Sequence, residues 1–503
     1  MSCRNCGFVP QSQPETTNSS DSVVSQILRG QRPLLDSDHS LLSAEIVELE
    51  RQQSVYDTQL EMIQLRRRAV LKAIESRKSI YAPIRRLPRD ILIEIFDSVC
   101  DSWWQENERG VYHSLDVSGP HHSLDVSGPL WVLGRVCGFW RDALHSSPAS
   151  WARKLVVQAP FSKYAPEILQ TYLEHTGEHH LNVQVFCRKA AKDDKILSLL
   201  VQSCQRWTNL SISACQPHMP HFESISHFPA LQTVGLYIYD GYGRTVCHSD
   251  MFLSAPQLRR ASLLGHQIKL PPGITHLSGS ITCPEDLRLL SNLPKLRRCH
   301  LWMSLPTKEA PVVTVAHLTH LYVDVVDMLN FLSAPLLSSL TISRILPGPS
   351  STQESITRFL HRSRCHLESL SVGEQIFTSI TLSSLFALDA CSTISRLKLE
   401  LPPWLISSVA KALASPSVLP HLHRLIICIS QYSYDAWTAI LRMACSRRDA
   451  GLLKLVEVQF EEEAYKYFRE EDIRTLTEDD FEMRIEKWDP PYLDPLYLLR
   501  PAR

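Results

Sequence analysis

Few residues of this chain have the types and spacing that catalysis or metal binding needs. Cys3 and Cys6 form a CxxC pair, as in half of a zinc site, but no second pair follows at finger spacing. His317 and His320 lie close in sequence without a third metal ligand nearby, and we expect both at the surface. The motifs of zinc proteases, phosphate-binding loops and serine hydrolases (HExxH, GxxxxGKS/T and GxSxG) are absent. We therefore expect no metal, no cofactor and no catalytic residue in this chain.

The bulk composition is that of a globular protein with apolar cores. The chain has 503 residues, 44% of them hydrophobic and 21% charged, with a formal net charge of −1. A balance so close to neutral gives no general attraction to nucleic acid or to an anionic membrane. The 14 cysteines are scattered, and the sequence has neither a signal peptide nor an apolar run of about 20 residues. We expect a reduced, intracellular protein of the cytoplasm or the nucleus, with no membrane and no nucleic acid among its partners.

The chain begins with a polar stretch that leads into a heptad pattern. Residues 1–38 are rich in Ser, Gln, Pro and Thr without any period, and we expect them to be disordered. Residues 39–82 carry two interleaved apolar series with seven-residue spacing: Leu42, Leu49, Tyr56, Ile63 and Val70, and Ile46, Leu60, Ile74 and Tyr81. They predict one long, amphipathic, coiled-coil-like helix. Gln53, Arg67 and Arg77 interrupt this seam, so two interpretations stay open: a homodimerising coiled coil, or a single helix folded against its own protein.

Apolar residues at helical spacing occupy residues 83–155. The segment opens with PIRRLPRDILIEIFDSVC, where Pro88 suits the first position of a helix. A second apolar face follows at Leu133, Val136, Cys137, Trp140 and Leu144. Ser147 and Pro148 then begin a third short helix that contains Trp151. The spacing predicts three small helices with a small core, so another chain or the rest of the protein must cover part of their apolar surface.

Residues 101–128 of this segment have the composition of a loop. They contain a tandem duplication, in which HSLDVSGP runs from His113 to Pro120 and again from His122 to Pro129. A packed core rarely accepts such an insertion, whereas a surface loop does. We expect a permissive surface loop in which the sequence has duplicated by slippage.

From about residue 180 a degenerate repeat of the form apolar-x-x-apolar-x-apolar takes over. Its copies are Trp207–Leu210–Ile212, Leu231–Val234–Leu236, Leu258–Ala261–Leu263, a weak Ile274–Leu277, Leu296–Cys299–Leu301, Leu318–Leu321–Val323, Leu337–Leu340–Ile342, Leu367–Leu370–Val372, Ile394–Leu397–Leu399, Leu422–Leu425–Ile427 and Leu453–Val456–Val458. The last two apolar positions share one face of a strand, and the first lies in the turn before it. One unit cannot bury its own apolar face, so the units must stack.

This repeat resembles the leucine-rich repeat, whose units are about 20–29 residues long. It departs from that family in its irregular spacing and in the missing Asn after the strand, where Arg344 and Gly373 stand instead. The resemblance implies an irregular leucine-rich-repeat-like solenoid over residues 156–460. The alternative is an α/β domain whose strands happen to share the pattern. Residues 461–503 are acidic, and we expect a solvated C-terminal cap or tail.

The helical segment at residues 83–155 resembles the F-box family. The matching features are LPRDILIEIF, then L-x-x-V-C-x-x-W from Leu133 to Trp140, then S-P-x-x-W from Ser147 to Trp151. The resemblance implies binding to the Skp-type adaptor subunit of SCF (cullin–RING) ubiquitin ligases. Carried over residue by residue, the contacts would be made by Leu87, Pro88, Ile91, Leu92, Ile95, Phe96, Val136, Cys137 and Trp140. The alternative is that these residues form only the core of the segment itself.

Together the two resemblances imply a substrate-recognition adaptor of the α+β class, with a long N-terminal helix, a three-helix F-box-like module and an α/β repeat half. The F-box would dock on the ligase, and the repeat half would hold an unknown target protein near the ubiquitin-conjugating enzyme, without catalysis by this chain. In leucine-rich repeats the residues between core positions face the concave side, which nominates six possible substrate contacts: Tyr237, Trp302, Tyr322, Asp324, Lys398 and Glu400. The competing hypothesis is a non-catalytic scaffold that dimerises through residues 39–82.

Overall fold

The computed structural model describes most of the chain between residues 19 and 487. The described stretches are 19–113, 123–187, 194–239, 248–264, 267–281, 284–303, 311–344, 352–373, 385–430, 433–451, 453–460 and 481–487. The chain divides into two compact units, residues 1–88 and residues 89–503. Within the described stretches, no helix combines the length and the apolar character needed to cross a bilayer.

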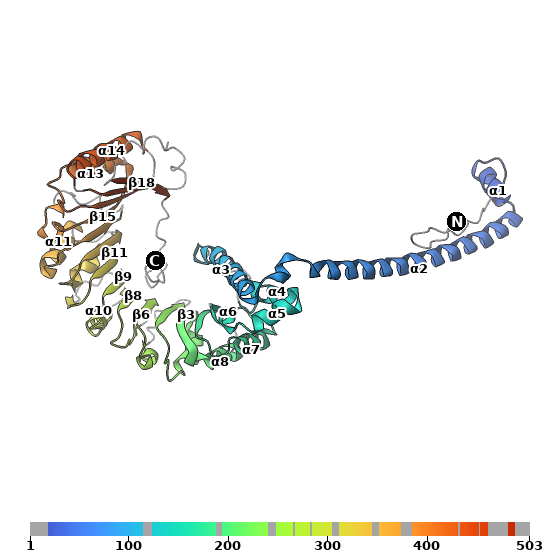
Figure 1. Ribbon diagram of the computed structural model, residues 1–503, viewed down its shortest axis with the longest axis horizontal. Coiled ribbons are helices and arrows are strands. Elements are labelled where there is room, and N and C mark those ends of the chain that lie inside the picture. Colours follow the sequence, from blue (N-terminus) through green and yellow to red (C-terminus); the bar gives the residue numbers. More distant parts are fainter. Residues whose placement is uncertain are drawn as a thin grey trace. The chain divides into compact units, whose positions relative to one another are not determined.

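The N-terminal unit is helical. α1 spans Ser19–Leu28, α2 spans Asp36–Ile80 and the short 3-10 helix η1 spans Pro83–Arg86. α2 is 45 residues long and contains neither Gly nor Pro, so nothing in its sequence interrupts the helix. None of its residues is buried. The prediction of one long N-terminal helix is confirmed (Figure 1).

The prediction of disorder for residues 1–38 is wrong for part of that range. Residues 1–18, including Cys3 and Cys6, lie outside the described residues, but α1 and the first turn of α2 are helical. The apolar residues of α1 recur at helical spacing: Val23, Val24, Ile27 and Leu28. The polar composition of residues 1–38 as a whole predicts disorder, because these four apolar residues are few among the many Ser and Gln residues.

Four helices begin the second unit, and we call them the helical module. They are α3 (Arg89–His113), α4 (Pro129–Val136), α5 (Gly138–His145) and α6 (Pro148–Ala152). The expectation of three helices is therefore wrong, because the described residues of the module form four. Cys137 is extended, with φ −163° and ψ 168°, and divides the predicted second helix in two. Gly134 and Gly138, which have weak helix propensity, lie on either side of it.

Helix α3 continues into the predicted loop at residues 101–128. Residues 101–109 contain neither Gly nor Pro, so nothing stops the helix there, and it runs to His113. Residues 114–122, which hold most of the first duplicated copy, lie outside the described residues. The second copy forms a turn from Ser123 and leads into α4. The loop is therefore shorter than predicted.

One parallel sheet dominates the second unit. Within the described residues it has 14 strands in the order β1-β2-β3-β4-β6-β8-β9-β11-β13-β14-β15-β16-β17-β18. The strands are β1 Leu155–Gln158, β2 Leu181–Cys187, β3 Trp207–Cys215, β4 Thr233–Tyr239, β6 Arg260–Leu264, β8 His276–Ile281, β9 Arg298–Met303, β11 His320–Val325, β13 Ser339–Arg344, β14 Ser369–Val372, β15 Arg396–Leu401, β16 Arg424–Ile429, β17 Leu455–Phe460 and β18 Glu482–Lys487. Two short ladders stand apart from it: β5 (His248–Ser249) with β7 (Gln267–Ile268), and β10 (Val313–Thr314) with β12 (Leu332–Ser333).

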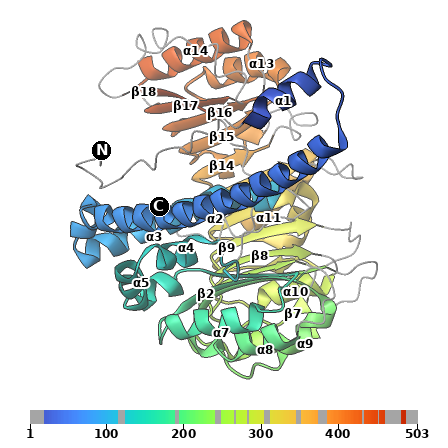
Figure 2. The same cartoon turned by 90° about the vertical axis from the view of Figure 1, so that its right-hand side faces the viewer.

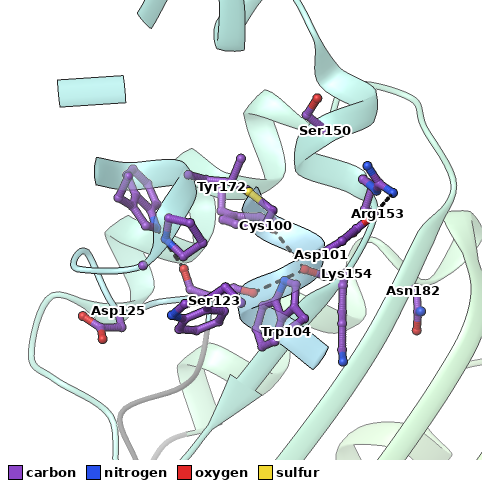
Figure 3. A pocket seen from close by; sticks show the side chains of 15 residues that line it. Cys100, Asp101, Trp104, Ser123, Asp125, Ser150, Arg153, Lys154, Tyr172 and Asn182 are labelled. Carbon is purple, nitrogen blue, oxygen red and sulfur yellow. Dashed lines mark hydrogen bonds and ion pairs between the residues drawn. The ribbon is translucent and has the colours of Figure 1, made fainter. Parts of the chain in front are cut away.

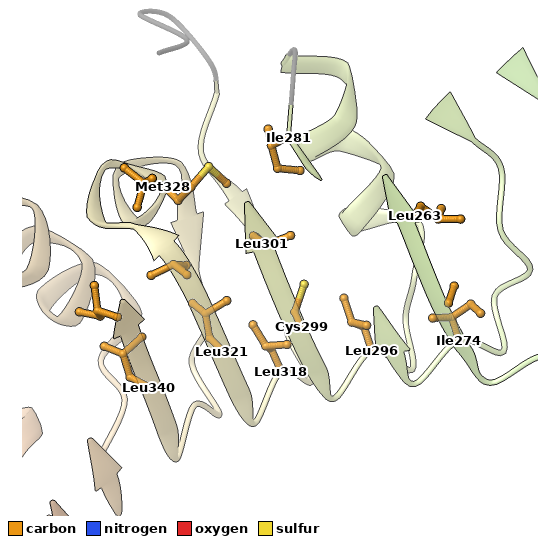
Figure 4. Close-up of a cluster of buried hydrophobic side chains, with 14 of the residues drawn as sticks. Leu263, Ile274, Ile281, Leu296, Cys299, Leu301, Leu318, Leu321, Met328 and Leu340 are labelled. Carbon is orange, nitrogen blue, oxygen red and sulfur yellow. The ribbon is translucent and has the colours of Figure 1, made fainter. Parts of the chain in front are cut away.

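The repeat pattern sets the register of this sheet. The second apolar residue of every predicted copy falls in one row that crosses all the strands: Leu155, Val183, Leu210, Val234, Ala261, Leu277, Cys299, Leu321, Leu340, Leu370, Leu397, Leu425, Val456 and Met483. All of them except Leu277 are buried. Figure 4 shows neighbouring strands placing their apolar side chains in this shared core. Stacking of the units therefore buries what a single unit leaves exposed.

Helices and 3-10 turns connect the strands. They are α7 Ala165–His175, α8 Asp194–Val201, η2 Cys204–Arg206, η3 Gln216–His218, α9 Met219–Glu223, η4 Met251–Ser254, α10 Pro284–Ser291, η5 Val326–Phe331, α11 Thr352–Ser363, η7 Asp389–Cys391, α13 Pro403–Leu413 and α14 Tyr434–Asp449. The longer ones, such as α10, α11, α13 and α14, lie along one face of the sheet (Figures 1 and 2). The residues between the core positions lie on the opposite face, which we call the open face. The fold is mixed α/β with a parallel sheet, as expected.

The sheet extends beyond the predicted repeat at both ends. β1 and β2 precede it, and β18 lies in the segment that was expected to be an acidic cap or tail. Phe481 and Met483 bury their side chains there, while residues 461–480 and 488–503 lie outside the described residues. The predicted domain boundary between residues 155 and 156 does not divide the compact units, because Trp151 and Leu155 belong to the same core.

A fully buried arginine fixes the C-terminal part of the sheet's helical cover. Arg447 of α14 has no exposed surface. Its guanidinium donates hydrogen bonds to the carbonyl oxygens of Leu413 (2.5 Å), Ser415 (3.0 Å) and Leu419 (3.1 Å), and also to that of Val418. These carbonyls end α13 and line the segment after it, where no helical N–H remains to satisfy them. One side chain therefore ties the end of α13 to α14.

Candidate docking surface and the open face of the sheet

The apolar residues of α3 divide into an exposed and a buried side. Ile91, Ile95 and Val99 follow one another at intervals of four residues and are 38%, 37% and 45% exposed. Residues at this spacing share one face of a helix, and we call these three the α3 stripe. Leu92 and Phe96 lie on the buried side, with no exposed surface. Of the predicted adaptor contacts on α3, the structure thus leaves Ile91 and Ile95 accessible.

The buried side of α3 packs on the helices that follow it. The rings of Phe96 and Trp140 lie 4.9 Å apart, centroid to centroid. Cys137 and Trp140 are half-buried, and Val136 at the end of α4 is 55% exposed. Leu92, Phe96 and Trp140 therefore hold the module together, whatever else they contact. Leu87 and Pro88 end the N-terminal unit.

Tryptophans anchor the module to the sheet. Trp151 is buried, its ring lies 5.3 Å from both Trp131 and Tyr172 of α7, and its indole N–H donates to the Leu144 carbonyl at 3.2 Å. The Tyr172 hydroxyl donates to the backbone carbonyl of Lys154 at 3.1 Å, just before β1. The sequence led us to expect that part of the module's apolar surface is covered, and here the cover comes from the chain itself.

An ion-pair bridge fastens the middle of α3. Arg153, just after α6, contacts the carboxylates of Asp97 at 3.0 Å and Asp101 at 2.6 Å. Both carboxylates are partly exposed, so each pair contributes modestly, but together they fix the rotation of α3 about its axis. Asp97 lies between Ile95 and Val99 in the sequence, so the bridge holds the same part of α3 that presents the stripe.

A cavity of about 330 Å³ opens beside this bridge (Figure 3). Trp103 and Trp104 of α3, Trp131 of α4 and Lys154 contribute to its walls. The Lys154 ammonium lies 4.8 Å from the centre of the Trp104 ring, a cation–π distance. Burial, assisted by the neighbouring carboxylates of Asp97 and Asp101, raises the pKa of the Cys100 thiol to about 12. This thiol stays protonated at neutral pH, so it is a poor nucleophile.

The predicted substrate contacts all lie on the open face, but in three separate places. Trp302 and Tyr322 come together around His300, with ring centroids 4.2 Å and 4.0 Å from the imidazole. Asp324 follows Tyr322 on the same strand and face. Tyr237 is on β4, where its hydroxyl lies 2.9 Å from that of Ser262, and Lys398 and Glu400 are on β15. The structure therefore groups only Trp302, Tyr322 and Asp324.

The open face also carries a basic group that the sequence interpretation missed. His276, Arg298 and His320 are direct neighbours across β8, β9 and β11. The sequence predicts His320 at the surface, where it lies, but Arg298 and His276 come beside it only through the register of the strands. The available signal was the repeated Thr–His dipeptide, Thr275–His276 and Thr319–His320, one residue before the row position of each strand.

Comparison with known proteins adds no relative. No family model matches the chain, and no curated protein sequence matches it. Among the described residues, no group of three or more His, Cys, Asp or Glu side chains is placed to hold a metal ion. The function must therefore be argued from the surfaces described above.

Proposed function

We propose that this protein is a non-catalytic, substrate-recognition adaptor of an SCF (cullin–RING) ubiquitin ligase. The observation that carries the proposal is the exposed α3 stripe, set in a module whose motifs follow the order of the F-box family. Scattered exposed apolar residues are ordinary on protein surfaces, but branched residues aligned on one helix face suit a partner groove. Asp90 and Glu94, both exposed, give that stripe a polar rim. The partner we propose is the Skp-type adaptor subunit.

The repeat half completes the proposed function. Its single spacing rule and its row of core positions, buried on every strand except β8, support an irregular leucine-rich-repeat-like solenoid, and we propose that the open face of its 14 strands binds a target protein. Tyr237, Trp302, Tyr322, Asp324, Lys398 and Glu400 are the proposed target contacts. Holding a target beside a charged ubiquitin-conjugating enzyme raises its effective concentration, which requires no catalytic residue in this chain. The proposed site of action is the cytoplasm or the nucleus.

A scaffold that self-associates through α2 remains the competing function. The specific observation in its favour is that α2 buries none of its heptad residues. Self-association and adaptor binding use different helices, so the first does not argue against the second. Only adaptor binding separates the two functions.

Co-purification of the full chain with the Skp-type subunit tests the proposal. We expect an equimolar complex that survives size-exclusion chromatography, because interfaces anchored by a few buried apolar residues commonly reach micromolar affinity or better. The measurement is the mass of the complex by light scattering. A full chain that is folded by circular dichroism yet elutes apart from the adaptor subunit would refute the proposed function.

A further inference from the structure

Two rows of polar side chains meet on the open face at β8, β9 and β11. His276, Arg298 and His320 form the first row, on strands spaced about 4.8 Å apart. The second row lies two residues further along the same strands and continues onto β13: Ser278, His300, Tyr322 and Thr341. Together with Ser339 these side chains line a cavity of about 150 Å³. The parallel register therefore gathers three imidazoles, a guanidinium and several hydroxyls at one place.

The same hydrogen-bond device orients the two outer histidines. The Thr275 hydroxyl donates to the Arg259 carbonyl at 3.1 Å and lies 2.8 Å from Nδ1 of His276. A hydroxyl has one proton, so with that proton on the carbonyl it must accept from Nδ1–H. The remaining nitrogen, Nε2, then carries the lone pair and is free to take up a proton.

Thr319 repeats this arrangement two strands away. Its hydroxyl donates to the Arg297 carbonyl at 3.0 Å and lies 3.0 Å from Nδ1 of His320. His276 and His320 therefore stand on either side of Arg298 with the same tautomer. Protonation of either ring would add an N–H donor beside the guanidinium.

His300 at the cavity wall has a buried ring nitrogen without a hydrogen-bond partner among the described residues. Its side chain is only 2% exposed, and Nε2 has no hydrogen-bond partner in the part of the chain that the structure describes. Nδ1 lies 3.4 Å from the Ser278 hydroxyl, and Trp302 and Tyr322 hold the ring in place. A buried nitrogen without a partner is costly, and in the tautomer that carries its proton on Nε2 an oxygen acceptor inside the cavity would satisfy it.

The electrostatics favour an anion. Burial and then the surrounding cations lower the pKa of His276 to about 4, and burial and Arg298 also lower the pKa of His320. The charged and titratable groups on the strands around this pair are Arg260 of β6, Arg297 just before β9, Arg298 and His300 of β9, Tyr322 and Asp324 of β11, and Glu368 before β14. Arg298 between the two histidines repels a metal cation, whereas a dianion is attracted by Arg298 and would offset the unfavourable effect of this guanidinium on protonation of the two imidazoles.

We propose that this cavity binds a phosphate monoester. The guanidinium of Arg298 donates hydrogen bonds to two phosphate oxygens, and His276 and His320 donate as protonated rings. The hydroxyls of Ser278 and Thr341 complete the set of hydrogen-bond donors around the phosphate. The site does not depend on the ligase assignment, because it rests only on the register of β8, β9, β11 and β13. The phosphate belongs either to a phosphorylated side chain of a bound protein or to a free small molecule, and the two sources share this chemistry.

Calorimetric titration of the full chain tests the site. The probes are inorganic phosphate, a blocked Ala-Ala-phosphoserine-Ala-Ala peptide and the same peptide without phosphate. We expect phosphate-dependent binding that Arg298→Gln weakens roughly tenfold or more, since it removes a bidentate, charge-assisted contact. Arg288→Gln on α10 removes an equal charge from an exposed site outside the cavity and should bind like the unchanged chain.

The relative affinities identify the source of the phosphate. A peptide that binds more tightly than inorganic phosphate indicates a phosphorylated protein, and equal affinities indicate a small molecule. Either result supports the site. Absence of phosphate-dependent binding, or equal binding by the Arg298→Gln variant, overturns it.

The histidines also give the site a pH signature. Their pKa values are depressed in the free protein, and a bound dianion raises them, so binding takes up protons. Affinity for sulfate, which keeps both charges, should therefore rise as the pH falls from about 7.5 to about 5.5, while phosphate itself gains a proton near pH 6. The double variant His276→Gln/His320→Gln should abolish this dependence. A flat sulfate profile in the unchanged chain contradicts the role of the histidines.

A second and independent inference concerns α2, whose two halves carry opposite charge. Residues 36–61 hold seven carboxylates and one arginine, whereas residues 62–80 hold six lysines and arginines and one glutamate. The heptad residues on both halves are exposed, for example Tyr56 at 60% and Ile63 at 61%. A helix with one acidic and one basic half is complementary to a second copy that runs in the opposite direction.

The seam residues favour the same direction. In a parallel, in-register pair Arg67 would face Arg67 of the second copy, and Gln53 would face Gln53. In an antiparallel pair centred between Glu61 and Met62, Arg67 lies opposite Tyr56, and Gln53 lies opposite Val70. The antiparallel arrangement replaces a buried like-charge contact with an arginine beside an aromatic ring. We infer that α2 forms an antiparallel coiled coil with α2 of a second copy.

Photo-cross-linking of the full chain tests this pairing. With Tyr56→p-benzoylphenylalanine, irradiation should give a dimer in which the label is joined to the peptide around Arg67. The triple reversal Arg66→Glu/Arg67→Glu/Arg68→Glu should weaken dimerisation in light scattering roughly tenfold or more, whereas Arg85→Glu/Arg86→Glu, outside α2, should not. A cross-link to the peptide around residue 56, or a monomer at micromolar concentration, overturns the inference.

Discussion

A chain that carries Ile91→Glu and Ile95→Glu should lose about 100-fold or more of its affinity for the Skp-type adaptor subunit, and should still fold. Both side chains belong to the α3 stripe and are more than a third exposed, so two carboxylates there meet solvent in the free protein. In a complex the same carboxylates would be buried without partners. Each such change at an interface centre typically costs about 2 kcal/mol or more. Surface plasmon resonance with the purified adaptor subunit measures the loss.

Two variants make that result specific. Trp404→Glu introduces a carboxylate at a residue of α13 that is 73% exposed and far along the chain from α3, and it should bind the adaptor normally. Phe96→Ala should fail by another route, since removing a fully buried ring that packs on Trp140 destabilises the module by about 3–5 kcal/mol. A double variant of the stripe that binds the adaptor as well as the unchanged chain would leave the F-box proposal without its main support.

Arg447→Met should lower the free energy of unfolding by about 3 kcal/mol. The methionine fills much of the volume, but the carbonyls of Leu413, Ser415, Val418 and Leu419 lose their donor inside the protein. Each buried, unsatisfied carbonyl costs about 1–3 kcal/mol. Part of this loss is offset because the variant no longer buries a charged guanidinium. Urea unfolding followed by circular dichroism measures the difference.

Arg442→Met is the matched control for this variant. Arg442 lies on the same helix, α14, but is exposed, so the same substitution should change the stability by no more than about 0.5 kcal/mol. Equal stability losses for the two variants would show that Arg447 acts as an ordinary helix residue. A loss confined to Arg447→Met would assign the effect to its carbonyl contacts.

The sequence was most informative where one physical rule repeats. The apolar-x-x-apolar-x-apolar spacing located the strand register from β3 to β17, because the second residue is buried in every one of these strands except β8, where Leu277 is half-buried. It failed at β2 and β18, where His180 and Asp480 stand in place of the first apolar residue. β2 and β18 are stabilised by pairing with the neighbouring strands of the sheet, and a local sequence pattern does not show this pairing.

The candidate sites needed information that the sequence does not contain. Ile91, Leu92, Ile95 and Phe96 fit one broad apolar face, and the packing of α4, α5 and α6 on α3 decides which pair is buried. The phosphate-site residues are separated by about twenty positions each, so their proximity follows from the register of three strands. The division of the predicted second helix at Cys137 likewise depends on how α4 and α5 pack, rather than on the apolar spacing alone.

The core that joins the helical module to β1 and α7 has a consequence for the proposed adaptor function. It concerns which lysines of a bound target would receive ubiquitin. Trp151 packs on Tyr172 in a core that continues into the sheet, so the C-terminal end of the helical module lies directly against the beginning of the sheet. If the chain is the proposed adaptor, targets bound at different strands would lie at different distances from the reactive thioester of the ubiquitin-conjugating enzyme. Which lysines receive ubiquitin would depend on where along the sheet the target is seated more than on the sequence around each lysine.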